Sequence, residues 1–387
     1  MLTQIKLSNF KSFKEPTVID FNATKYSMLK ESNTKDNVLK GSLFIGANAS
    51  GKTNAIYSIS VLLDLLFSNS IVDMTSNFCL FSSEKEMELE YTFVFNDDKI
   101  VYDIVFDRTG KVVKETATLN NQMIFERMGL EARTTLTEKK NHHREDIEER
   151  TLFLKAVYFN TRFTNCEPFK KWFEYMSKSI YFNAERHFIG QALAFNVNNK
   201  VNLREYLDTY GVSDINAFFS YFGFKQEITY ASAQRLSDFV TAQTVFGDKD
   251  IYFKRDEMDV WIPISLESMG NKTLLSMLPC LLHIVKNGGM FIVDEFSSAF
   301  HNELEELIIR YFMENTEHAQ MFFVSHSTNL LKTSLLRPDQ IYTVSFVKEK
   351  GSVLKRVSSE QPRESQNLEK MYLSGMFDGL PNYTVGD

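Results

Sequence analysis

Cysteine is scarce in this chain of 387 residues, which has three: Cys79, Cys166 and Cys280. They form no CxxC pair, so the sequence contains no thiolate metal site and is typical of a protein with reduced thiols. Long hydrophobic runs are also lacking. The most apolar one, residues 274–285, is interrupted by Pro279 and is shorter than the roughly 20 residues of a membrane-spanning helix. The first residues do not resemble a signal peptide, so we expect a cytoplasmic protein that makes no membrane contact.

An excess of basic residues is missing as well. The chain has 43 Lys and Arg against 50 Asp and Glu, a net charge of -7. This balance argues against a protein that coats nucleic acid by charge alone, although it leaves room for DNA contact through a local patch. Sustained heptads and sequence repeats are absent, which excludes a long coiled coil. The 43% of hydrophobic residues are ordinary for a globular protein of two or so domains, or of one domain with an insertion.

The N-terminal part combines strand and helix patterns. Residues 2–7 alternate in polarity, residues 42–45 form a short apolar run, and residues 55–67 are apolar nearly all round. These patterns predict a strand, a buried strand and a well-buried helix. Residues 87–118 alternate again in stretches separated by polar turns. We therefore expect an antiparallel β meander here.

The character of the chain changes between residues 126 and 247. Residues 131–150 are dominated by charge, which predicts a solvated helix face or a loop. Residues 151–240 are rich in Phe, Tyr and Leu at mixed helical spacing, which predicts a compact helical subdomain. We therefore divide the chain into residues 1–125, a helical and charged insertion at 126–247, and residues 248–387.

Strand and helix patterns return in the C-terminal part. Residues 290–293 and 321–324 are short and apolar, and helical stretches follow them. Such runs are typical of buried parallel strands in an α/β fold. Residues 341–348 and 352–357 are joined by Lys350 and Gly351, which predicts a hairpin. Two α/β parts thus flank the middle segment.

A phosphate-binding motif follows the apolar run at 42–45. It consists of Gly46, Ala47, Asn48, Ala49, Ser50, Gly51, Lys52 and Thr53, with Asn54 next in the chain. The octet matches G-x-x-x-x-G-K-[ST], in which glycines let successive N–H groups face a phosphate and the next helix adds its positive end. Lys52 would reach the β- and γ-phosphates, and the Thr53 hydroxyl would bind Mg²⁺. A glycine turn that happens to precede a helix is the alternative, but the strand before and the helix after favour ATP and Mg²⁺.

Two acids follow the apolar run at 290–293. A buried strand would carry Asp294 and Glu295 to its C-terminal end, where ligands bind in open α/β sheets. Asp294 would then hold Mg²⁺ through water, and Glu295 would orient and deprotonate the attacking water. Strands often end in solvated acids, so the pair is a weak signal alone. The preceding phosphate-binding motif makes the catalytic interpretation the stronger one.

A histidine ends the other predicted parallel strand. His326 follows residues 322–325, about 30 residues after the acidic pair. An imidazole at this place can contact the γ-phosphate and report whether it is present. A lone histidine at a strand end is usually only a polar terminus. Its spacing from Asp294 and Glu295 favours the catalytic role.

These elements, in this order, resemble the nucleotide-binding heads of the ABC/SMC class of ATPases. Walker A corresponds to residues 46–53, Walker B to 290–295 and the switch histidine to His326. The resemblance implies an α/β fold: an ABC-type P-loop NTPase head, with a mixed sheet core and an antiparallel meander, into which the helical segment is inserted.

The resemblance also implies a signature segment before Walker B. Ser268 and Gly270 occupy that place, ahead of the apolar run at 274–285, although Met269 stands where the usual form has glycine. In the family this segment binds the γ-phosphate held by the opposite protomer. ATP is thus sandwiched in a head-to-tail homo-oligomer. An ordinary helix N-cap is the alternative for Ser268.

A narrower resemblance concerns the start and the end of the chain. Residues 5–13 are similar to the first strand of SMC- and RecF-like heads, and residues 337–341 and 372–375, with Pro381, match a tail pattern. Together they resemble the stand-alone AAA-family ATPases of bacterial abortive-infection and anti-phage systems, the OLD/RloA/AbiL-like group. His301, after Glu295, favours that branch over a transporter ATPase.

The narrower resemblance implies a slow ATPase that acts as a switch in anti-phage defence. Its partner would be a separately encoded toxic effector, commonly a Toprim-type or other nuclease, because the chain after residue 295 lacks a new acidic constellation. The main alternative is a RecF/SMC-like DNA-repair ATPase that clamps on DNA. A scaffold that binds ATP and hardly hydrolyses it is a third hypothesis.

Overall fold

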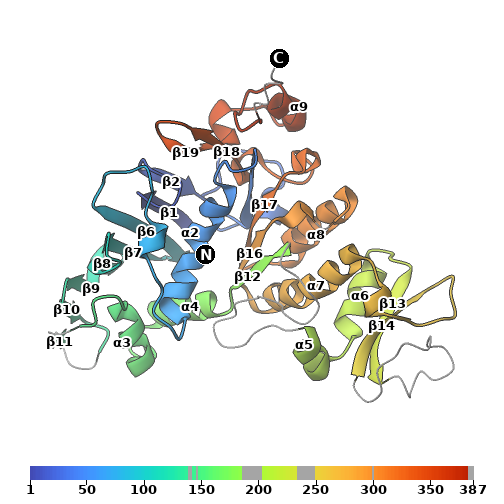
Figure 1. Cartoon of the computed structure of the whole chain (residues 1–387), viewed down its shortest axis with the longest axis horizontal. Coiled ribbons are helices and arrows are strands. Elements are labelled where there is room, and N and C mark those ends of the chain that lie inside the picture. Colours follow the sequence, from blue (N-terminus) through green and yellow to red (C-terminus); the bar gives the residue numbers. More distant parts are fainter. Residues whose placement is uncertain (138–141, 145–146, 185–202, 233–248, 299, 382–387) are drawn as a thin grey trace.

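A computed structural model describes residues 1–137, 142–144, 147–184, 203–232, 249–298 and 300–381. Within this part, eight strands form an antiparallel sheet in the order β11-β10-β9-β8-β7-β6-β1-β2 (Figure 1). They are β1 (Leu2–Ser8), β2 (Thr17–Asp20), β6 (Glu86–Phe95), β7 (Asp98–Asp107), β8 (Val112–Leu119), β9 (Gln122–Met128), β10 (Glu131–Thr134) and β11 (His142–Arg144). The pairing of β6 with β7 and of β7 with β8 confirms the predicted meander.

The meander is longer than predicted, because it continues into the charged stretch at 131–150. We expected a helix face or a loop there, and this expectation was wrong for β10 and β11. Ala132 and Thr134 are buried, whereas Glu131 and Arg133 are exposed. This period of two is that of a strand with one solvated face. The prediction rested on the high charge of the stretch and overlooked this alternation.

A six-stranded mixed sheet forms the centre of the molecule, in the order β12-β16-β17-β5-β18-β19. Its strands are β5 (Gly41–Gly46), β12 (Ile180–Asn183), β16 (Gly289–Asp294), β17 (Ala319–Ser325), β18 (Ile341–Val347) and β19 (Gly351–Arg356). All neighbours are parallel except β18 and β19, which form the predicted hairpin. β12, from the middle segment, pairs with the strand that carries Asp294.

Both faces of the central sheet are covered. Phe44, Ile292 and Phe322 belong to a core shared with α2 (Lys52–Phe67) and the antiparallel sheet. Their neighbours in the strands, such as Leu43, Phe291 and Phe323, belong to a second core with α7 (Met269–Asn287) and α8 (Asn302–Asn315). Strand side chains alternate between faces, so a strand buried on both faces is a continuous apolar run. Figure 1 shows α2 on the meander side and α7 and α8 on the other.

The helices of the middle segment divide between these two cores. α3 (Phe153–Thr161) and α4 (Glu167–Ser177) join the core of α2, whereas α5 (Leu203–Tyr210) and α6 (Ser213–Tyr221) join that of α7. They do not form the one compact subdomain that we expected, although the boundaries at 125 and 247 stay a prediction. Every helix in the described part of the chain is too short or too polar to span a bilayer.

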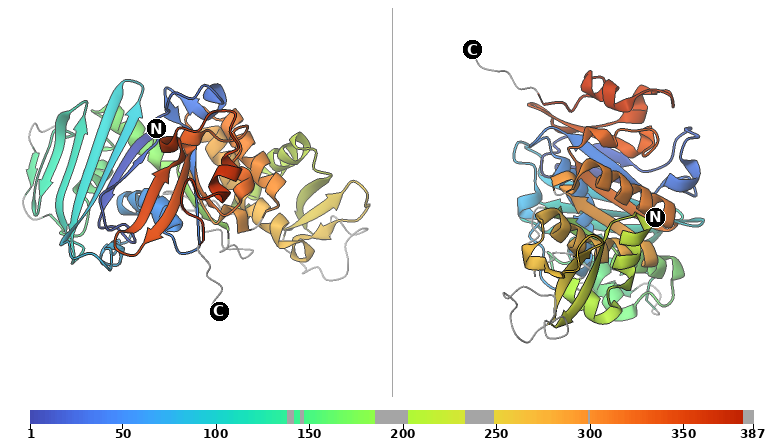
Figure 2. Two further views of the ribbon diagram at one scale, coloured as in Figure 1. Left: turned by 90° about the horizontal axis from the view of Figure 1, so that it is seen from above. Right: turned by 90° about the vertical axis from the view of Figure 1, so that its right-hand side faces the viewer.

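Smaller elements complete the fold. They are α1 (Lys30–Asn33), β3 (Thr34–Lys35), β4 (Val38–Leu39), α9 (Leu368–Leu373) and a three-stranded sheet of β13 (Gln226–Ser232), β14 (Lys249–Arg255) and β15 (Ile262–Pro263). Figure 2 shows the three-stranded sheet at the end of the molecule opposite the meander. The central sheet lies between them.

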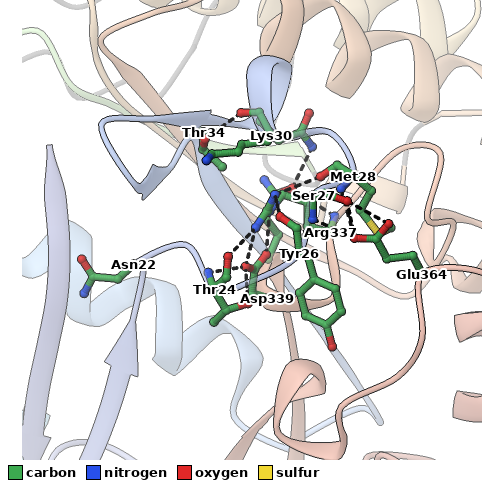
Figure 3. A network of polar contacts seen from close by, with 12 residues as sticks. Asn22, Thr24, Tyr26, Ser27, Met28, Lys30, Thr34, Arg337, Asp339 and Glu364 are labelled. Atoms are coloured by element: carbon green, nitrogen blue, oxygen red, sulfur yellow. Dashed lines mark hydrogen bonds and ion pairs between the residues drawn. The ribbon is translucent and has the colours of Figure 1, made fainter.

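A buried ion pair fastens an N-terminal segment to the C-terminal part (Figure 3). The Arg337 guanidinium donates to both carboxylate oxygens of Asp339, at 2.9 and 2.8 Å, and both side chains are fully buried. Arg337 also donates to the carbonyl oxygens of Thr24, Tyr26 and Met28. Burial raises the pKa of Asp339, but the hydrogen bonds from Arg337 and Thr24 outweigh it and keep the pKa below its ordinary value.

Candidate nucleotide-binding site

The phosphate-binding loop lies between β5 and α2, as the motif predicts. β5 ends at Gly46, and α2 begins at Lys52. Gly51 has a φ of 106°, which an L side chain rarely adopts, and a Cβ there would lie 2.1 Å from Ser352 Oγ. A Cβ at Gly46 would lie 2.2 Å from the carbonyl oxygen of Val344. Conformation and crowding therefore require glycine at 51, and crowding requires it at 46.

This loop borders a cavity of about 920 Å³. The cavity is lined by residues 46–49 and 51–54 of the loop, by Glu295, Ser298, His326 and Thr328, and by Tyr372, Leu373, Leu380 and Pro381 near the C-terminus. The N-terminus of α2 points its unpaired N–H groups toward this place. The volume lies in the range of small-molecule and cofactor sites.

Lys52 lies beside the carboxylates of Asp294, the last residue of β16, and of Glu295, which follows it. Its Nζ donates to the carbonyl oxygens of Gly46 and Ala47, at 3.0 and 2.8 Å, and the residue is buried. Burial lowers the pKa of Lys52, while Glu295 and Asp294 oppose this effect. The ammonium group is thus held over the loop on the cavity side, where it can meet a phosphate.

Asp294 joins the loop to the strands beside it. Thr53 Oγ1 donates to one carboxylate oxygen at 3.1 Å, and the other accepts from Tyr181 Oη at 3.2 Å and Asn183 Nδ2 at 3.3 Å. Burial raises the pKa of Asp294, and Glu295 adds to this effect. A hydroxyl and a carboxylate side by side are the oxygen donors that Mg²⁺ prefers beside a phosphate. The donor set therefore fits the predicted metal.

Glu295 faces His326 across the same cavity. Glu295 Oε2 lies 3.6 Å from His326 Nε2. Contact with His326 lowers the pKa of Glu295, burial opposes this, and Lys52 lowers it further. The φ of 54° at Glu295 is uncommon for a residue with a side chain and often marks a functional position. An ionised carboxylate beside the phosphate loop can accept a proton from water.

A family model matches most of the chain, including the residues that form this geometry. The family described as "AAA domain, putative AbiEii toxin, Type IV TA system" matches residues 42–332. The chain belongs to this AAA family. The match includes the phosphate loop, both acids and His326. The predicted likeness to P-loop ATPases of abortive-infection systems is thereby confirmed.

Solved structures with the same fold are SMC heads. The SMC head domain from Thermotoga maritima covers 91% of this chain, and the chain covers 97% of it, with a TM-score of 0.50 and 15% identity. The Pyrococcus furiosus Smc head with an extended coiled coil, bound to the C-terminal domain of ScpA, has a TM-score of 0.52, 13% identity and coverages of 93% and 97%. At such identities the likeness shows the fold alone. It confirms the predicted ABC-type head.

One curated relative has a similar sequence. Structural maintenance of chromosomes protein 4 of Caenorhabditis elegans is 24% identical over 243 residues, which is 60% of this chain. The chain spans 15% of the length of that relative. The fold of an ABC-type ATPase head is what this AAA protein shares with the SMC heads.

Ser268 and Gly270 lie apart from the phosphate loop of the same chain. Ser268 is the N-cap of α7, and its Oγ accepts a hydrogen bond from the Asn271 N–H at 3.3 Å. Neither residue is among those that line the cavity. The N-cap role is therefore present in the structure. A role toward ATP would have to act on a second copy, and it stays a prediction.

Two features of the site could not be foreseen from the motifs. Tyr181 and Asn183 come from the middle segment, and only the polar end of the apolar run 180–183 marks them in the sequence. Asn54, Ser12 and Ser352 form a chain of hydrogen bonds of 2.7 Å beside the loop. Residues so distant in sequence are brought together only by the sheet.

A buried carboxyl group lies one turn into α8, beside the strand end that carries His326. Glu305 is fully buried, and its Oε1 accepts from Ser327 Oγ at 3.0 Å, whereas Oε2 has no hydrogen-bond partner. Burial raises the pKa of Glu305 to about 7, against the opposing effect of Ser327. This group therefore titrates near neutral pH.

We expect Glu305→Gln to remove a pH-dependent loss of stability. A carboxyl with a pKa of 4.5 when unfolded and about 7 when folded binds its proton more tightly in the folded protein. As the pH rises from about 4.5 to about 7, the free energy of unfolding of the wild type therefore decreases. Above pH 7 it stays low. A pKa difference of about 2.5 corresponds to at most ~3 kcal/mol. Urea unfolding at pH 5 and pH 8 should show that the Gln variant becomes more stable relative to the wild type at the higher pH. An equal difference in the free energy of unfolding at both pH values would contradict this.

Proposed function

We propose that the protein is an ATP-dependent switch, in which two copies close around ATP and separate after slow hydrolysis. The observation that carries this proposal is that Thr53, Glu295 and His326 line one cavity beside the phosphate loop. There Thr53 donates a hydrogen bond to Asp294, and Glu295 lies beside His326. In phosphoryl transfer, such groups bind the phosphates and the metal ion, and they orient and activate the attacking water.

Each group has a defined task in this proposal. The N–H groups of the loop and Lys52 bind the β- and γ-phosphates. Thr53 and Asp294 would hold Mg²⁺, which when bound neutralises phosphate charge. Glu295 positions a water molecule and accepts its proton, and His326, 3.6 Å away, contacts the terminal phosphate. Ser268 and Gly270 complete the site of a second copy.

We infer that the switch serves anti-phage defence by abortive infection and controls a separately encoded toxic effector, such as a Toprim-type nuclease. The description of the matching family names a putative AbiEii toxin and a type IV toxin–antitoxin system. This description supports a role in abortive infection. In this proposal the chain supplies the ATPase switch, and a partner protein supplies the toxicity. The ATP-bound assembly would hold the effector, and hydrolysis would release it.

The test uses cells that carry the gene with its operon neighbours and are challenged with phage. We expect protection with wild type and none with Lys52→Ala. We also expect the neighbouring protein to co-purify with Glu295→Gln in the presence of ATP. Full protection by this chain without its neighbours would contradict the effector model.

A DNA clamp is the second candidate. The likeness to SMC heads, one of them bound to ScpA, favours this function. It requires ATP-dependent binding to duplex DNA with a steep dependence on salt. The net charge of -7 counts against it. Failure to bind duplex DNA with ATP at low salt would exclude it.

Lys52→Ala should weaken ATP binding. The ammonium group is the cation that the loop holds over the phosphate site, and hydrogen bonds between charged groups are worth enough for a loss of ~10- to 100-fold in affinity. The dissociation constant is measured by titration with a fluorescent ATP analogue, and a melting curve checks the fold. Unchanged affinity in a folded variant would place the nucleotide elsewhere.

A further inference from the structure

A buried carboxylate fixes the loop that precedes α7. The Glu267 side chain is 2% exposed, and its oxygens accept from Arg255 Nη2 at 2.8 and 3.0 Å. The same carboxylate accepts from Asn271 Nδ2 at 2.8 Å and from the Ser268 N–H at 3.3 Å. Glu267 therefore connects Arg255 to both residues of the Ser268 N-cap.

Arg255 reaches this loop from β14, which pairs with β15, the strand that leads into the loop. It is the last residue of β14, in the three-stranded sheet. β14 pairs with β13 along its whole length and with β15 at Tyr252 and Phe253. The strand that carries Arg255 is thus fixed, and its side chain spans from this sheet to the start of α7. Figure 1 shows β13 and β14 beside α6 and away from the central sheet.

Two apolar residues close to Ser268 face outward, although Glu267 between Leu266 and Ser268 is buried. Leu266 and Met269 are each 59% exposed, and Ser268 itself is exposed. An exposed serine between two exposed apolar side chains, at a helix N-terminus, is suited to meet another molecule. Glu267 thus fixes the loop on its buried side, and Ser268 is exposed on the other side.

We propose that Arg255 is a positioning residue for the closure of two copies on ATP. Through Glu267 it holds Ser268 and Gly270 where the ATP of a second copy would meet them. The three-stranded sheet then controls how tightly two copies close, although it contacts no nucleotide itself. This inference rests on the proposed function, because it needs the ATP-bridged pair.

The physical reason is the cost of leaving a buried carboxylate without its cation. If Arg255 is replaced by Met, Glu267 keeps its burial but loses its charged partner, which is unfavourable. The carboxylate would turn toward water and draw Ser268 and Asn271 with it. The phosphate loop of the same chain, which lies elsewhere, would be unaffected.

Association in the Glu295→Gln background tests the proposal first. Light scattering over a dilution series with saturating Mg²⁺ and ATP gives the dissociation constant of the pair. Arg255→Met should weaken association by ~10- to 100-fold, with ATP affinity per protomer unchanged. Arg255→Lys, which keeps the charge on a shorter side chain, should lie between. Lys249 lies on β14 like Arg255, and Lys249→Met breaks an exposed ion pair with Asp208 of α5. This variant is the matched control and should have no effect.

Mixing two variants separates positioning from a local structural role. Arg255→Met protein has an intact phosphate loop, and Lys52→Ala protein has an intact Ser268 loop. A mixed pair therefore contains one complete site, so the mixture should hydrolyse ATP faster than the sum of the two proteins alone. A defect that also damages the phosphate loop of the Arg255→Met copy would give no gain, and that result would overturn the proposal.

The outcomes also distinguish this inference from the proposed function. If Glu295→Gln protein associates with ATP, and Arg255→Met associates as tightly as Lys249→Met, only the role of Arg255 is wrong. If the Glu295→Gln protein stays monomeric with ATP, the proposed function fails and this inference fails with it.

Discussion

Glu295→Gln should bind ATP and Mg²⁺ like the wild type but hydrolyse ATP about 10²- to 10⁴-fold more slowly, the range of a lost general base. Gln keeps the shape of the side chain and its place 3.6 Å from His326 but cannot accept the proton of the attacking water. The effect should therefore fall on the rate constant of hydrolysis and not on the affinity for ATP.

Single-turnover hydrolysis with saturating Mg²⁺ measures this loss directly. Glu306→Gln is the matched control, because Glu306 is a carboxylate of α8 that pairs with Lys332 at 2.5 Å and does not line the cavity. It should hydrolyse ATP at the wild-type rate. An unaltered rate in Glu295→Gln would assign the proton acceptor to another group.

Arg337→Met should lower the free energy of unfolding by ~3–5 kcal/mol, the scale of breaking a buried ion pair. The substitution leaves the fully buried Asp339 without its cation and frees the carbonyl oxygens of Thr24, Tyr26 and Met28. Figure 3 shows these groups converging on the one guanidinium. The N-terminal segment would then lose one of its attachments to the C-terminal part.

Urea unfolding compares this variant with two others. Lys35→Met breaks the exposed pair with Glu317, whose side chain is 74% exposed, and should cost at most ~1 kcal/mol. Arg337→Met combined with Asp339→Leu should be more stable than Arg337→Met alone, because no buried charge remains unpaired. A loss in Arg337→Met no larger than in Lys35→Met would show that the network contributes little.

The motifs predicted those parts of the site that are local in sequence. Residues 46–53 are one contiguous loop, and Asp294, Glu295 and His326 stand at the ends of apolar runs. Adjacent parallel strands bring such ends together, and β16, β17 and β5 are neighbours. The roles of these residues in hydrolysis stay predictions, whereas the family and the ABC-type fold are confirmed.

The sequence could not show which distant residues complete the site. An amphipathic pattern indicates that a helix buries one face, but not against what, so the division of α3 to α6 between two cores was missed. Arg255 and Glu267 are twelve positions apart and on different elements. The contribution of β12 to Asp294 likewise depends on a pairing that no local pattern encodes.

The most direct test of the central claim is the mass of Glu295→Gln protein by light scattering, with and without Mg²⁺ and ATP. The account predicts a doubling of mass with ATP, and its loss when Ser268 is also replaced by Arg, a side chain too large for a closed phosphate contact. A mass that ATP does not change, in protein shown to bind ATP, would contradict a switch that works by closing two copies on the nucleotide.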